Sequence, residues 1–200
     1  KPDRIAYYSY AHVPWIKGLG QRGYDENDLP KDEAKRELYE VGKQLFDKIG
    51  YVEVGMDHFS LKTDSMYKAM EEKTLHRNFM GYTSGKTALM VGLGMSAISD
   101  SWYSFAQNVK TVEEYQEVVN QGEIPLLRGH LLSEEDLIIR KHILNIMCHF
   151  ETSWKNTDQQ TPAFLEGLKL LDEMKEDGLV IVEDNKLTVP EKGRLFVRNI

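Results

Sequence analysis

The sequence predicts an α/β fold followed by a small helical domain. Of its 200 residues, 41% are hydrophobic and 28% are charged, which is the balance of a folded globular chain. Strand-like and helical segments alternate over residues 1–108, a pattern typical of α/β units with parallel strands. The pattern changes near residue 133, where two amphipathic helices and a hairpin follow. We therefore expect an α/β region at 1–108, a connecting segment at 109–132 and a helical, winged-helix-like domain at 133–200.

The first region is expected to contain three strands and two helices. The expected strands are residues 5–10, 51–56 and 89–94, the last an apolar run typical of a strand covered on both faces. Apolar residues recur with a helical period between Ala34 and Ile49, and Gly50 suits the position after a helix end. A short helix is expected at 64–73. Three strands leave unpaired edges, so this region is expected to be a piece of something larger.

The C-terminal part carries the signals of two capped helices. Ser133 precedes three acidic residues and opens a helix that is expected to run to about Phe150. A second helix is expected from Thr161, which is followed by proline, to Gly178. Residues 179–189 predict a hairpin.

Charge, hydropathy and cysteine content exclude several classes of protein. The net charge is −7, and residues 131–200 hold 9 basic against 13 acidic side chains, which disfavours binding to nucleic acid or an anionic membrane. No apolar run of about 18 residues and no signal peptide are present, so no membrane span or export is expected. One cysteine, Cys148, excludes a disulfide framework, fits a reducing cytoplasm and cannot hold a metal cluster alone.

Two glycine-rich segments invite comparison with phosphate-binding loops. In residues 81–87 only three residues separate the glycines and no helix follows, so a plain loop is the better interpretation. Residues 92–97 fit the pattern G-x-G-x-x-A but lack the acid that a dinucleotide site needs at a set distance. Close backbone packing explains these glycines, which would also let a ligand approach the main chain.

Two polar clusters stand where an α/β fold places ligands. Asp57–His58 follows an expected strand, and His76–Asn78 is expected to open a loop. Functional and structural interpretations of both clusters are equally supported. His142 and His149 lie two helical turns apart, too far to share a metal ion.

Four segments, in order along the chain, carry a family resemblance. They are YAHVP at 10–14, GMDHF at 55–59, LHRNFMGYT at 75–83 and GLGMSAIS at 92–99. Together they resemble the C-terminal portion of oxygen-independent coproporphyrinogen III oxidase, a radical S-adenosylmethionine enzyme of haem synthesis. The similarity covers nearly the whole chain, including GRLFVRNI at its end. The related haem-chaperone family shares the fold but lacks the second and third segments.

The resemblance implies the C-terminal part of a three-quarter (β/α) radical-SAM barrel, followed by the small helical domain. It implies a [4Fe–4S] cluster held by a C-x3-C-x2-C loop outside this chain, in the missing N-terminal half of the barrel. In the family, S-adenosyl-L-methionine is cleaved to a 5′-deoxyadenosyl radical that abstracts hydrogen from propionates of coproporphyrinogen III. Loss of carbon dioxide and an electron at two propionates gives the vinyl groups of protoporphyrinogen IX.

The implied partners are coproporphyrinogen III, an electron donor and an electron acceptor, in the cytoplasm. By itself the fragment is expected to be inactive. The alternative is a non-catalytic haem-binding or haem-chaperone-like module of the same superfamily. A C-x3-C-x2-C loop upstream of Lys1 would favour the enzyme.

The resemblance assigns Ala11 and Ile98 to contacts with S-adenosylmethionine. It assigns no catalytic residue or metal ligand within the chain. Four further residues are candidates for the substrate: Arg22 and Arg77, whose guanidinium fork suits a carboxylate, and His58 and His76, for propionates or pyrroles. Each can equally be a surface or structural residue.

Overall fold

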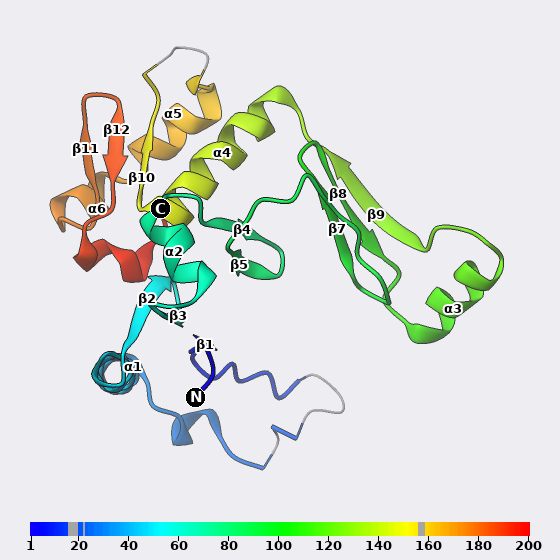
Figure 1. Cartoon of the computed structure of the whole chain (residues 1–200), viewed down its shortest axis with the longest axis horizontal. Coiled ribbons are helices and arrows are strands. Elements are labelled where there is room, and N and C mark those ends of the chain that lie inside the picture. The colour runs from blue at the N-terminus through cyan, green and yellow to red at the C-terminus, as the bar shows by residue number, and fades with distance from the viewer. Residues whose placement is uncertain (16–19, 22, 156–158) are drawn as a thin grey trace. The chain divides into compact units, whose positions relative to one another are not determined.

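The computed structural model describes residues 1–15, 20, 21, 23–155 and 159–200. These residues form two compact units, Lys1–Lys68 and Ala69–Ile200. Figure 1 shows the order of the helices and strands along the chain.

The first unit is a three-stranded antiparallel sheet with one long helix. Its elements are β1 (Arg4–Ala6), the 3-10 turn η1 (Glu26–Asp28), α1 (Asp32–Lys48), β2 (Tyr51–Gly55) and β3 (His58–Leu61). The sheet order is β1-β3-β2, with Val54 and Phe59 buried in the core. The predicted helix and its end near Gly50 (φ 86°) are confirmed. The first strand is shorter than expected.

The expected parallel pairing of strands is wrong, since every strand pair among the described residues is antiparallel. In the first unit the reason is the two-residue connection Met56–Asp57, with Asp57 at φ 60°, which reverses the chain into β3. A parallel crossover needs a dozen or more residues. β3, which the sequence pattern did not predict, therefore lies between β1 and β2.

Tyr7 joins the end of β1 to α1. Its ring stacks on Tyr39 at 5.5 Å and meets Phe46 edge-on at 5.2 Å, and its hydroxyl donates to the Leu38 carbonyl at 3.1 Å. This close approach depends on Gly42, because a Cβ there would lie 2.5 Å from the Tyr7 ring carbon Cζ. The Tyr7 ring thus packs directly against the bare backbone of one helical turn.

The first part of the second unit contains one short helix followed by two small antiparallel sheets and a further helix. Its first elements are α2 (Ser65–Glu71), which starts in the first unit, β4 (His76–Asn78), β5 (Gly81–Thr83), β6 (Leu89–Met90), β7 (Ile98–Ser101), β8 (Ser104–Asn108), α3 (Val112–Asn120) and β9 (Leu126–Leu131). β4 pairs with β5, and the other strands form a sheet in the order β6-β7-β8-β9. The short helix expected at 64–73 is confirmed.

Two expectations in this part are wrong. The expected buried strand at 89–94 is reduced to β6, and Leu89, Val91 and Leu93 are 62%, 63% and 84% exposed. The chain leaves the sheet after Met90 because it must turn back to enter β7 as an antiparallel neighbour. His76–Asn78 is a strand rather than the start of a loop, since β5 lies close enough in sequence to pair with it.

The C-terminal part is built from helices around a second small sheet. Its elements are α4 (Glu134–His149), β10 (Glu151–Ser153), α5 (Pro162–Lys169), α6 (Asp172–Glu176), β11 (Ile181–Glu183), β12 (Lys186–Thr188) and the 3-10 segment η3 (Glu191–Phe196). The predicted Ser133 cap is confirmed, and the hairpin gains β10 as a third strand, in the order β10-β12-β11. The second predicted helix is split, because the amides of Leu170 and Leu171 bond three residues back instead of four. Leu187, Val180 and Val189 form the centre of this core.

Arg140 connects α4 to the β7–β8 turn. Its guanidinium pairs with Asp100 at 2.8 Å and donates to the carbonyls of Ser101 and Trp102 at 2.9 and 3.2 Å. It also lies 4.8 Å from the ring centres of Trp102 and Phe105. The side chains of Arg140 and Asp100 are only 13% and 8% exposed. Each buried charge is therefore stabilised by the opposite charge of its partner.

No helix among the described residues is both long enough and apolar enough to cross a membrane.

We expect Gly42→Ala to destabilise the first unit, although alanine favours a helix interior over glycine by about 1 kcal/mol. The added methyl overlaps the Tyr7 ring, and such overpacking costs about 1–3 kcal/mol. Amide hydrogen exchange across α1 measures the change. In a Tyr7→Leu background the same substitution should be neutral or stabilising, and slower exchange in the wild-type background would contradict the packing.

We expect Arg140→Ala to lower the free energy of unfolding of the second unit by about 3–5 kcal/mol, because it leaves the Asp100 carboxylate buried without its partner. Urea unfolding followed by tryptophan fluorescence measures the loss. The double variant Arg140→Met/Asp100→Leu should lose less than Arg140→Ala. A loss under about 1 kcal/mol for Arg140→Ala would show that the pair contributes little.

Candidate functional site

The chain after β1 is held by one glutamine side chain. Gln21 donates from Nε2 to the Ala11 carbonyl at 3.1 Å and accepts the Val13 amide at Oε1, at 2.7 Å. Ala11 itself is exposed. A ligand at Ala11 therefore meets a main chain whose direction is already fixed.

An aromatic cluster flanks Ala11. The rings of Tyr10, His12 and Tyr24 lie 5.4–6.1 Å apart by their centres, and the two tyrosine hydroxyls are hydrogen-bonded. Nδ1 of His12 is buried and has no hydrogen-bond partner in the described part of the chain. The cluster provides both an aromatic surface and one unused polar atom beside Ala11.

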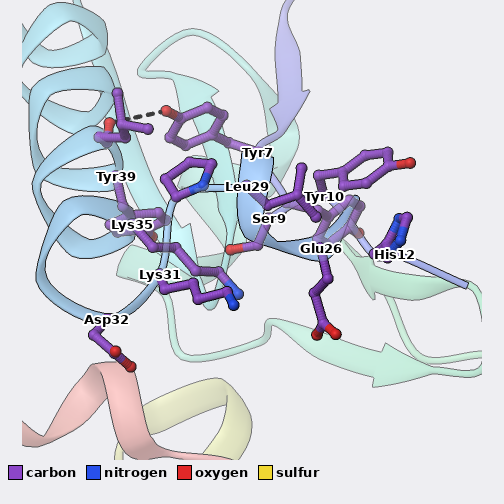
Figure 2. Close-up of a pocket in the computed structure, with 13 residues that line it drawn as sticks. Tyr7, Ser9, Tyr10, His12, Glu26, Leu29, Lys31, Asp32, Lys35 and Tyr39 are labelled. Carbon is purple, nitrogen blue, oxygen red and sulfur yellow. Dashed lines mark hydrogen bonds between the residues drawn. The ribbon is translucent and has the colours of Figure 1, made fainter. Parts of the chain in front are cut away.

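A cavity of about 760 Å³ lies next to this segment in the first unit. Figure 2 shows its lining by the tyrosines after β1, by Lys31 and Lys35 before and within α1, and by Glu26 of η1. Tyr39 donates its hydroxyl to Glu53 at 3.2 Å. Burial, and then the carboxylates of Glu53 and Asp57, raise the pKa of Tyr39, so it stays a protonated phenol.

His58 is engaged in the hairpin that contains it. Its Nδ1 lies 2.8 Å from the Met56 carbonyl, which can only accept, so Nδ1 carries the proton. Its Nε2 lies 3.2 Å from the Tyr8 hydroxyl, which then donates. These bonds give His58 a structural role, and its contact with substrate stays a prediction.

In the second unit, residues 92–97 form a tight loop before Ile98. A Cβ on Gly92 would lie 2.8 Å from the Ile98 main chain, so the close packing expected of this glycine is confirmed. The Asn108 side-chain amide donates to the carbonyls of Gly92 and Gly94 at 3.0 and 2.9 Å. The Gly94 amide donates to the Tyr115 hydroxyl at 3.0 Å. The loop is thus fixed by β8 and α3, and it holds the half-buried Ile98 at the start of β7.

His76 and Arg77 are neighbours on β4 but have different surroundings. His76 lines a cavity of about 440 Å³ with residues of α4. Burial, and then the charges of Lys86 and Arg140, lower its pKa, which favours neutral imidazole at neutral pH. The Arg77 guanidinium lies 5.3 Å from the Tyr82 ring centre, and its Nε is buried without a partner in the described part of the chain.

The predicted residues are divided between the two units. Ala11 and His58 belong to the first unit, and Ile98, His76 and Arg77 to the second. Arg22 lies outside the described residues. Gln21 and Asn108, which hold the two main-chain segments, are not among the residues predicted from the sequence. No local pattern singles out Asn108, because Ser104 and Gln107 of the same strand are also polar.

The described residues do not form a metal centre. No group of three or more histidine, cysteine or acidic side chains among them could hold an ion. Cys148 is 3% exposed, and burial raises the pKa of its thiol to about 12. A [4Fe–4S] cluster needs several thiolates, so these residues do not fit one.

No model of a protein family matches the chain. The oxygen-independent coproporphyrinogen III oxidase of Escherichia coli is 36% identical over 100% of this chain and 44% of its own length. The Pseudomonas aeruginosa enzyme of the same name is 33% identical over the same shares. A solved structure, described as coproporphyrinogen III oxidase (HemN) from Escherichia coli, a radical SAM enzyme, superposes with a TM-score of 0.89 at 38% identity. It is matched over 100% of this chain and 47% of that one.

The chain thus spans slightly less than half the length of the relatives it matches, and it corresponds to the C-terminal part of the solved structure. The sequence match and the structural match each cover the full chain. Over its full length the chain is homologous to the C-terminal part of oxygen-independent coproporphyrinogen III oxidases.

Proposed function

We propose that this chain is the C-terminal part of an enzyme that oxidatively decarboxylates coproporphyrinogen III to protoporphyrinogen IX. Each of two propionates loses one hydrogen atom, one electron and carbon dioxide, and a vinyl group remains. The match to the family over the full chain, at 36% identity and a TM-score of 0.89, is the observation that carries the proposal. The electron donor and acceptor are separate partners, and the proposed location is the cytoplasm.

S-adenosylmethionine is the cofactor that the family implies, and two segments of this chain suit it. The Ala11 main chain is exposed but fixed, and Ile98 offers an apolar surface beside a closely packed glycine loop. When bound, this cofactor supplies the hydrogen-abstracting radical. The role of this chain's residues is to hold the cofactor by main-chain and apolar contacts and to exclude water.

The [4Fe–4S] cluster belongs, in this proposal, to a missing N-terminal barrel half. The described residues lack a ligand set, as Cys148 is a buried thiol. The helix α1 also leaves Leu38, Val41 and Leu45 about half exposed along one face. An apolar stripe of this kind is suited to burial against further barrel elements. In the same proposal residues 1–108 complete the three-quarter barrel, 109–132 connect, and 133–200 form the winged-helix-like domain.

Among the substrate candidates, Arg77 and His76 retain the stronger support. Arg77 has an unused buried Nε, and His76 lines a cavity. Arg22 stays a candidate from the sequence alone, and His58 has both ring nitrogens occupied.

A non-catalytic haem-binding or haem-chaperone-like module is the alternative. The relatives named above are oxidases, which favours the enzyme. Sequence upstream of Lys1 separates the two, because the oxidase requires a C-x3-C-x2-C loop there.

We expect the 200-residue chain to bind no iron–sulfur cluster after anaerobic reconstitution and to cleave no S-adenosylmethionine, because Cys148 cannot supply the thiolates. A chimera in which the N-terminal half of the Escherichia coli relative precedes this chain should gain both activities. It should also convert coproporphyrinogen III. Iron content, 5′-deoxyadenosine release and porphyrin analysis measure these outcomes. A folded, cluster-loaded chimera that cleaves S-adenosylmethionine but leaves coproporphyrinogen III unchanged would refute the proposed reaction.

In the same chimera we expect Ala11→Trp to weaken S-adenosylmethionine binding about tenfold, because extra volume in a tight site costs about 1–3 kcal/mol. Equilibrium dialysis with labelled cofactor measures the affinity. Ala163→Trp, at an exposed position of α5, is the matched control and should leave the affinity unchanged. Equal affinity of both variants would remove Ala11 from the cofactor site.

A further inference from the structure

A second cavity, of about 440 Å³, lies within the second unit between β4 and one face of α4. Its apolar lining comes from Leu75, Leu144 and Cys148, of which Leu75 and Cys148 are buried. Lys86 and Lys141 line it with their charges, and Trp102 adds an aromatic ring. The cavity therefore combines an apolar lining with two cations.

The two lysines have no anionic partner in the described part of the chain, and no acidic side chain lines the cavity. The acids nearby are already paired. Asp100 binds Arg140 at 2.8 Å, and Glu151 binds Lys73 and Lys186 at 2.9 and 2.6 Å. Burial lowers the pKa of His76 and of His142, and the charges of Lys86 and Lys141 lower the pKa of His76 and of His142, respectively, further. The cavity has an uncompensated positive charge.

Trp102 determines where one of these charges lies. The Lys86 ammonium lies 3.7 Å from the centre of the Trp102 ring, a close cation–π contact. An ammonium held over a ring is positioned before any ligand arrives, so less side-chain entropy is lost on binding. The ring edge and the apolar lining remain to contact an uncharged part of the ligand.

We propose that this cavity binds the carboxylate of a propionate side chain, with the attached pyrrole against the apolar lining. The inference rests on the proposed function, whose substrate carries propionates on pyrrole rings, and it gives one of them a place in this chain. The volume lies near the lower end for ligand pockets, about 300–1,000 Å³. One pyrrole and its side chain, rather than the whole macrocycle, is the matching size.

The test measures binding of coproporphyrin III, the stable fluorescent oxidised form of the substrate, to the full 200-residue chain. The double variant Lys86→Gln/Lys141→Gln should bind it about tenfold more weakly, because two charge-assisted contacts are lost. Lys110→Gln/Lys169→Gln removes the same charge at exposed positions outside the cavity and should bind as the wild type does. Thermal unfolding verifies that all variants fold alike.

Small competitors test the ligand chemistry. 3-Phenylpropionate should displace coproporphyrin III from the wild type and shift the Trp102 indole N–H resonance, whereas 3-phenylpropanol should do neither. Equal competition by the alcohol, stronger competition by inorganic phosphate, or equal loss of affinity in both double variants would each overturn the proposal.

This outcome is separable from that of the proposed function. The binding test needs no cluster and no turnover. If the chimera converts coproporphyrinogen III but the Lys86→Gln/Lys141→Gln variant binds coproporphyrin III as the wild type does, the proposed function stands and the cavity proposal fails. If coproporphyrin III binding depends on the two lysines as expected but the chimera does not convert coproporphyrinogen III, the cavity proposal stands and the proposed function fails.

Discussion

The buried pair of Arg140 and Asp100 is the constraint on which the second unit depends. Because neither charge can be left unpaired in the interior, α4 must lie where its arginine reaches both the carboxylate and the carbonyls of the β7–β8 turn. The position of α4 then defines one wall of the cavity beside β4. The same pairing neutralises Asp100, which would otherwise attract Lys86. The positive charge of the cavity is thus a consequence of how the helix is anchored.

The β7 strand links the two candidate binding regions of this unit. Ile98, at its start, follows the loop that Asn108 holds, and Trp102, just past its end, faces Lys86. The strand rises about 3.3 Å per residue, so its first and last residues are about 10 Å apart. A contact to a cofactor and a contact to a substrate side chain would therefore be set at a fixed spacing by one short element. Any distortion of β7 would move both.

Local signals predicted the fold better than long-range ones. The Ser133 and Thr161 caps and the period of α1 each act within one or two helical turns, and all were confirmed. Strand pairing depends on partners elsewhere, and the antiparallel direction followed from a two-residue turn that the apolar pattern did not reveal. The prediction of a buried strand at 89–94 was wrong because apolar composition indicates that a segment favours burial but not which part of the protein buries it. Val91 and Leu93 are exposed in a chain that spans under half of its relatives.

The candidate site was harder to predict because its contacts are largely main-chain ones. Ala11 and Ile98 have no titratable group, and only the family resemblance, not their chemistry, makes them candidates. What positions them is Gln21 and Asn108, whose amides satisfy backbone carbonyls in loops. Titratable groups, in contrast, are mostly committed to structure here: Tyr39 to Glu53, and Cys148 to a buried protonated state. In the proposed function, this division of roles would let the chain orient a cofactor and a charged substrate, while other residues would supply the redox chemistry.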